Sequence, residues 1–290
     1  FGLVGFGLFM STMHLGKPHR FYRGFNNLRH SPVCREGLGI AIFMAALGLH
    51  IFFSLPDNSL FQGLFQAVFG TGLGSFGGTA AFFGYLAVPA SLAGLYYMNR
   101  CYRIKARPFW NHWQVATSFF GNMLSLGAFI GGSVIVATLA LTGGDLYGAE
   151  YQSLLTIAGS LMVLGMAAEA IGLSFHNRDM NCGNHEGAAS HYIQCTTFGK
   201  TYLLRNGLLT LNLVAALALT AAMATQSIAA ELSLIAWGLI GLTLIITATI
   251  GRALFYVLVV PTTMPGAFFW KNKGFEEHAR DIGLAEMPQV

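Results

Sequence analysis

The stretch His14-Leu15-Gly16-Lys17-Pro18-His19-Arg20, which continues to Ser31-Pro32-Val33-Cys34-Arg35-Glu36, is a polar loop between two apolar segments. Phe1–Met13 precedes the loop and Gly37–Leu55 follows it. No acidic residue occurs in the loop before Glu36, whereas five cations do: Lys17, Arg20, Arg23, Arg29 and Arg35. We therefore expect the rest of the chain to be a membrane scaffold that holds this loop at the lipid boundary.

The composition agrees with a membrane protein. Of the 290 residues, 54% are hydrophobic and only 10% are charged, with a mean hydropathy of +0.57. Soluble domains carry about 25% charged residues, and apolar runs of about twenty residues are long enough to cross hydrocarbon as helices. The sequence therefore predicts an all-α fold, a polytopic transmembrane helix bundle.

Seven apolar segments are expected in this chain: 1–13, 36–55, 78–98, 115–142, 153–175, 202–225 and 230–260. The first is too short to span about 30 Å of hydrocarbon. Because the chain starts with Phe1 inside that segment, we expect residues upstream of it and eight helices in the full protein. Residues 1–260 are expected to form the bundle, and 261–290 a tail.

The charges of the loops alternate along the chain. The loops at 17–35 and 99–114 are cationic, whereas those around 56–77 and at 143–152 carry acids and no Lys or Arg. Cytoplasmic loops are enriched in Lys and Arg. The pattern places loops 17–35, 99–114 and 176–201 and the C-terminal tail in the cytoplasm.

His14 and Glu36 are the first candidates for chemistry. Ionisable groups at helix ends near hydrocarbon are costly unless they are paired or hydrated, and so they mark candidate functional sites. An imidazole can exchange a proton near neutral pH, and a nearby carboxylate can relay it. A quinone headgroup needs such a setting. The alternative is structural, with Arg35 and Glu36 as interfacial anchors and His14 as a helix C-terminal cap.

Two further charges lie inside apolar segments, Glu169 and Arg252, and Tyr256 follows Arg252 by one helical turn. We expect Glu169 and Arg252 to be structural rather than catalytic. Arg205, near the start of another segment, is interpreted as an interfacial anchor.

No metal site is predicted. Cys182, His185, His191 and Cys195 resemble a zinc site in composition, but their spacing does not fit the usual frames, and a loop that contacts a partner is favoured. The four Cys include no Cys-x-x-Cys motif, so no iron–sulfur cluster is expected in this chain. No paired-His pattern for a haem is evident, and whether a haem is present stays open.

The run from His14 to Arg20, followed by Ser31, Arg35, Glu36 and Gly37, resembles the signature of membrane anchor subunits of the dimethyl sulfoxide (DMSO) reductase type, within the polysulfide-reductase-like anchor group. Cys34 stands where that signature has a second Ser. The resemblance extends more weakly to Asn99–Tyr102, Phe198–Arg205 and Gly251–Tyr256.

The resemblance implies eight transmembrane helices in a bacterial cytoplasmic membrane and no cofactor of the anchor's own. Partners would be an iron–sulfur subunit docked on the cytoplasmic loops and a catalytic subunit with a molybdopterin guanine dinucleotide cofactor, besides lipid; no nucleic acid is expected. The anchor would exchange electrons with menaquinone or ubiquinone. By position, the resemblance implies His14 and Glu36 at the quinone site, supported by Arg20 and Arg35, and we add Arg252 and Tyr256.

The direction of electron flow stays open. DMSO reductases resemble each other in placing their catalytic subunits outside the cytoplasmic membrane, whereas the charge pattern places loop 17–35 inside. The chain is therefore more similar to the anchor of the cytoplasm-facing sulfite:quinone dehydrogenase. One alternative is quinol oxidation for a reductase. Another is a transporter or a non-redox anchor, and a transporter would show a polar pathway at mid-membrane.

Overall fold

The computed structural model describes residues 1–13, 18–144, 148–181 and 187–258, and every regular element in those ranges is helical. Six helices there are long and apolar enough to cross a membrane, and α1 (Gly2–Thr12) is a shorter apolar helix. The prediction of an all-α bundle of transmembrane helices is confirmed. The chain forms two compact units, residues 1–101 and 102–290, which are described separately. The predicted tail, residues 261–290, lies outside the described residues.

The first unit is built around α2 (Pro32–Ser54) and α4 (Gly77–Tyr102, whose last residue belongs to the second unit). Ser31 caps α2, because its side chain accepts a hydrogen bond from the Cys34 amide (3.3 Å), and Pro32 occupies the first turn. The helix thus begins four residues earlier than 36–55 predicts. Glu36 lies inside it rather than at its start.

The two helices approach closely at a pair of glycines. A Cβ atom added at Gly39 would lie 2.7 Å from the Gly94 backbone, so only glycine permits this approach. Farther along, the His50 imidazole donates a hydrogen bond from Nδ1 to the Ala80 carbonyl (2.7 Å). These contacts fix the register of α2 against α4.

The loop predicted around 56–77 is partly helical, which corrects the sequence interpretation. It contains the single turn η2 (Leu55–Asp57) and α3 (Ser59–Phe69). The Asn58 side chain caps α3 by accepting from the Leu60 and Phe61 amides, and Gly70 ends it in the left-handed conformation (φ 72°). The apolar residues of α3 did not stand out because the helix is only 11 residues long.

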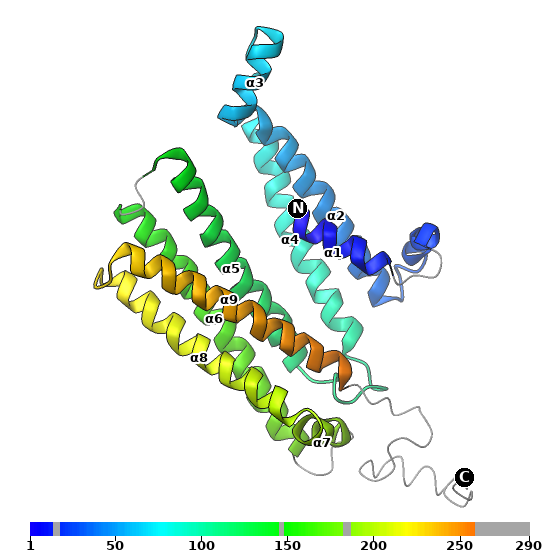
Figure 1. The fold of residues 1–290 in the computed structure, drawn as a ribbon. Coiled ribbons are helices and arrows are strands. Elements are labelled where there is room, and N and C mark those ends of the chain that lie inside the picture. Colours follow the sequence, from blue (N-terminus) through cyan, green and yellow to red (C-terminus); the bar gives the residue numbers. More distant parts are fainter. Residues whose placement is uncertain (14–17, 145–147, 182–186, 259–290) are drawn as a thin grey trace, which may run out of the picture. The chain divides into compact units, whose positions relative to one another are not determined.

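The second unit is a four-helix bundle of α5 (Gln114–Thr142), α6 (Ala149–Asn181), α8 (Gly199–Ala224) and α9 (Ala230–Val257). Figure 1 shows the four helices side by side. Helix α5 packs on α6, α6 on α8, α8 on α9, and α9 back on α5, which closes the bundle. Its core includes Leu155, Met162, Met166, Leu244 and Trp237.

Residues 176–201 are more helical than predicted. Helix α6 continues to Asn181, and the short helix α7 (Ala188–Thr196) packs on α6 and α8 at the same end of the bundle (Figure 1). His176 is therefore a helical residue of the bundle interior rather than a loop residue. A change in hydropathy marks where an apolar span ends, but it does not show that the helix continues with polar residues.

Candidate functional site

Glu36 is half-buried on α2 and faces the end of α4. Its Oε2 atom accepts a hydrogen bond from the Sγ–H of Cys101 (3.2 Å). Both residues lie in spanning helices, near the ends that the charge pattern assigns to the cytoplasm. A carboxyl group held in this way at the end of an apolar helix can take up or release a proton, so Glu36 is the centre of the first candidate site.

Arg35, which precedes Glu36 on α2, is held by local contacts of its own. Its Nε donates to the Leu28 carbonyl (2.7 Å), its Nη2 donates to the Arg29 carbonyl, and its guanidinium lies 5.4 Å from the centre of the Tyr97 ring. Arg20 is exposed on the turn η1 (Pro18–Phe25). His14 lies outside the described residues. Arg35 and Glu36 are consecutive on α2 but have different partners, and among the described residues no ion pair joins them. The roles of Arg35, His14 and Arg20 remain predictions.

Arg252 and Tyr256 belong to the second unit, on α9. The Arg252 guanidinium lies 3.7 Å from the centre of the Phe119 ring. The Tyr256 hydroxyl is 2.8 Å from that of Tyr102, and its side chain is 51% exposed. The contacts found for both are with residues of their own unit, so their assignment to the same site as Glu36 also remains a prediction.

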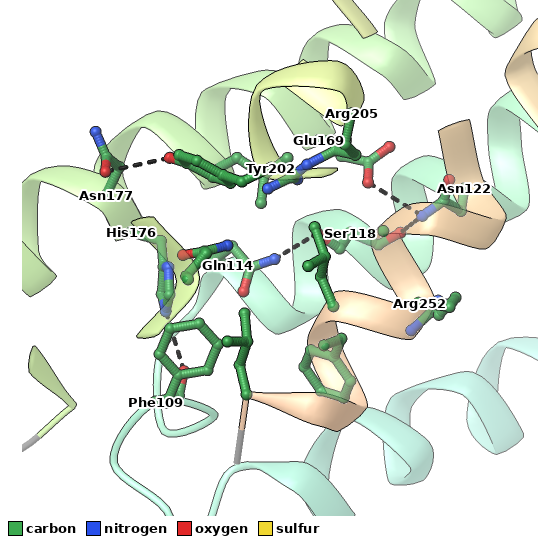
Figure 2. A pocket seen from close by; sticks show the side chains of 16 residues that line it. Phe109, Gln114, Ser118, Asn122, Glu169, His176, Asn177, Tyr202, Arg205 and Arg252 are labelled. Atoms are coloured by element: carbon green, nitrogen blue, oxygen red, sulfur yellow. Dashed lines mark hydrogen bonds between the residues drawn. The ribbon is translucent and has the colours of Figure 1, made fainter. Parts of the chain in front are cut away.

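The second unit contains a partly open cavity of about 40 Å³, lined by both polar and apolar side chains and roomy enough for water. Figure 2 shows its lining, which comes from α5, α6, α7, α8 and α9 and from Phe109 in the segment before α5. Sequence reasoning missed most of the polar side chains that line it: Gln114, Ser118, Asn122, His176, Asn177, Gln194 and Tyr202. A signal was present, because Gln114, Ser118 and Asn122 recur every four residues and so share one face of an apolar helix.

Glu169 and Arg205 are the most deeply buried charges of this cavity, 5% and 4% exposed. Asn122 donates from Nδ2 to Glu169 Oε1 (3.3 Å), as Figure 2 shows, and Arg205 lies 5.5 Å from the centre of the Tyr202 ring. Arg205 is therefore not the interfacial anchor that its place near a helix start suggested. Within the described ranges, no ion pair within 4.0 Å joins Glu169 to Arg205 or Arg252, and the Nε of Arg205 has no hydrogen-bond partner.

We expect Arg205→Leu to destabilise the folded chain by on the order of 2 kcal/mol. Removing one member of a contacting buried ion pair costs about 3–5 kcal/mol. We expect a smaller loss here because Arg205 and Glu169 are not in contact. The double variant Arg205→Leu/Glu169→Gln should recover part of the loss, because no buried carboxylate is then left without a nearby cation. Thermal unfolding of the detergent-solubilised protein would measure this, with the exposed Arg103→Leu as control. A double variant less stable than the single one would show that Arg205 does not act on Glu169.

His191 and Cys195 lie on α7, and the structure favours their uncharged forms. Burial lowers the pKa of the His191 imidazole, and its hydrogen bond with Gln194 opposes that shift. Burial also raises the pKa of the Cys195 thiol, 3.4 Å from His191 Nε2. Cys182 and His185 lie outside the described residues. Among the residues that are described, no three His, Cys, Asp or Glu side chains form a group that could hold a metal.

Comparison with known proteins identifies the family to which the chain belongs. Residues 1–258, which include all six candidate spans, match the family described as DMSO reductase anchor subunit (DmsC). No curated protein and no solved structure matches the chain. The family implies association with an iron–sulfur subunit and a catalytic subunit. The chain therefore belongs to the DMSO reductase anchor subunit family and is the multi-span membrane anchor of a DMSO reductase-type oxidoreductase complex.

Proposed function

We propose that this anchor exchanges electrons between a docked iron–sulfur subunit and the membrane quinone pool, at a site formed around Glu36. The observation that carries the proposal is the half-buried Glu36 carboxyl, hydrogen-bonded by Cys101. Arg35, the residue before it, is tied to the loop by its hydrogen bond to Leu28. Proton carriers and hydrogen-bond donors beside apolar helix surfaces are what a quinone headgroup requires. The family membership supplies the redox partners.

The residues of the first unit fit a quinone. Glu36 can hold or release a proton at its carboxylate, and the Phe25 ring lies next to Gly37 and supplies an apolar wall. Arg35 is proposed to supply a cation to the bound headgroup. His14 and Arg20 are proposed as further ligands. When bound, a quinone at this site supplies an acceptor for two electrons and two protons.

For the complex, we propose sulfite oxidation coupled to quinone reduction, in a bacterial cytoplasmic membrane with the tail in the cytoplasm. The alternating loop charges support this orientation. Oxidation of sulfite with water to sulfate releases two electrons and two protons, which balances the reduction of one quinone. The second candidate is quinol oxidation coupled to sulfoxide reduction, which the description of the matching family favours.

The test is to purify the complex from membranes through this chain, and to measure its subunits, molybdenum, iron and activities. We expect two partner subunits, both metals, and sulfite-dependent quinone reduction. Sulfoxide-dependent quinol oxidation in place of the sulfite reaction would reverse the proposed direction. Isolation of the chain alone, without molybdenum or iron, would contradict the electron-transfer proposal.

Cys101 offers a milder test of the same site. We expect Cys101→Ala to raise the KM for quinone about five-fold, because the loss of one hydrogen bond of about 1 kcal/mol frees the Glu36 carboxyl to rotate. Cys101→Ser, which restores a donor, should return most of the affinity. Steady-state kinetics of the purified complex would compare the two, and equal KM values for Ala, Ser and Cys at this position would show that the thiol does not orient Glu36.

A further inference from the structure

A groove on the surface of the second unit lies between α6 and α8, and all of its lining residues belong to that unit. Its volume is about 220 Å³. Three apolar side chains, Ala170, Leu173 and Leu209, form part of its lining, and the remaining lining residues are polar: Ser174, Asn177, Tyr202, Asn206 and Thr210. A polar groove on a membrane-spanning helix pair is unusual, because hydrocarbon cannot hydrogen-bond its polar groups.

The hydroxyl groups of this groove are satisfied within the protein, whereas two amide groups are not. Ser174 and Thr210 donate to carbonyls of their own helices, at Ala170 (2.8 Å) and Asn206 (3.0 Å). Tyr202 donates to Asn177 Oδ1 (3.2 Å), a bond visible in Figure 2. Among the hydrogen bonds of the described residues, none is made by the half-buried side-chain amide of Asn206, and none is donated by Asn177 Nδ2. Both amides therefore have donors to offer to an occupant.

The depth of the groove limits what that occupant can be. Asn206 follows the first residue of α8 by seven positions, about 10 Å along the helix, and Thr210 follows it by eleven, about 16 Å. Centring the helix of about 39 Å on a hydrocarbon layer of about 30 Å places both residues inside the hydrocarbon. Asn177, four residues before the end of α6, lies nearer the boundary. The ester and phosphate groups of a phospholipid stay at the boundary. An occupant that accepts a hydrogen bond from Asn206 therefore carries its accepting head into the hydrocarbon.

We propose that this groove is a second binding site for the head of an isoprenoid quinone. The Nδ2 groups of Asn177 and Asn206 donate to a ring carbonyl, Leu173 and Leu209 contact the ring, and the tail extends into the lipid. Tyr202 and Asn177 also line the inner cavity, so they form the wall between the groove and the buried pair of Glu169 and Arg205. The ligand class rests on the proposed function, whereas the place of this site does not.

Photolabelling of the intact complex in its membranes tests this site. The probe is an azide-bearing quinone, and the labelled peptides are identified by mass spectrometry. We expect label on peptides of α6 or α8, reduced about five-fold by Asn206→Leu, which removes a hydrogen-bond donor worth about 1 kcal/mol. The control is Thr249→Leu, another polar residue at the surface of a spanning helix, whose hydroxyl bonds only to Ile245 of its own helix. This control should leave the label unchanged.

A competition experiment on the unmodified chain keeps the test valid if Asn206→Leu does not assemble. Excess unlabelled quinone should suppress the label on α6 and α8, whereas excess phospholipid should not. Suppression by phospholipid, or label unaffected by Asn206→Leu in an assembled complex, would overturn the groove as a quinone site. Label confined to peptides around residues 14–36 would also overturn it while supporting the proposed function, and no label anywhere in the chain would contradict both.

Discussion

Replacing Glu36 by Gln is expected to lower quinone turnover at least 100-fold, while the complex still assembles. Glutamine has nearly the same size and can still accept the hydrogen bond from Cys101, so the contact between α2 and α4 is kept. It cannot hold a proton, and positioned general acids and bases contribute about 10²–10⁴-fold in rate. Turnover is measured in membranes with a soluble quinone, and assembly by the recovery of the partner subunits.

Glu231→Gln is the matched control, because Glu231 is an exposed carboxylate in the first turn of α9. It should leave turnover unchanged. If Glu36→Gln also retains full turnover in an assembled complex, proton exchange does not pass through Glu36 and the first candidate site is wrong.

The second large effect is expected at Gly165, where α6 crosses α5. A Cβ atom at Gly165 would lie 2.5 Å from the Gly121 carbonyl oxygen and 2.7 Å from the Ser125 amide nitrogen. These are backbone atoms, so they can move only if the helices separate. We expect Gly165→Val to lower the free energy of unfolding by about 3 kcal/mol or more, since overpacking by extra methylene groups costs about 1–3 kcal/mol even where side chains can adjust.

Gly238→Val is the control for this change. Gly238 is also inside a helix, but no atom outside its own helical backbone lies within 4 Å of its added Cβ, so helix propensity changes equally and packing does not. Unfolding of the purified protein in mixed micelles with increasing SDS would compare the two. Equal losses of stability would mean that α5 and α6 can separate without cost.

The amino-acid sequence was sufficient for the class of fold, because hydrocarbon imposes a local requirement on the chain. Each spanning segment must satisfy its own backbone hydrogen bonds as a helix and must be apolar over about twenty residues, so each can be recognised by itself. The start of α2 was placed four residues too late, although Ser31 and Pro32, which begin it, are a local signal that acts on the next turn only. The prediction of Glu36 as a candidate also needed only its neighbours in sequence, together with the resemblance of residues 14–37.

Only the tertiary structure decided which residues of different helices meet. Arg205 was mistaken for an interfacial anchor because its position near the start of α8 is the same for a residue facing lipid and for one facing the bundle. The rotation of a helix about its axis decides whether such a residue faces lipid or the bundle interior. Contacts between helices, such as Gly121 against Gly165, set that rotation. Because these contacts join residues of different helices that are far apart in the sequence, no local pattern contains them. For the same reason, neither the hydrogen bond from Cys101 to Glu36 nor the groove between α6 and α8 could be predicted from the sequence.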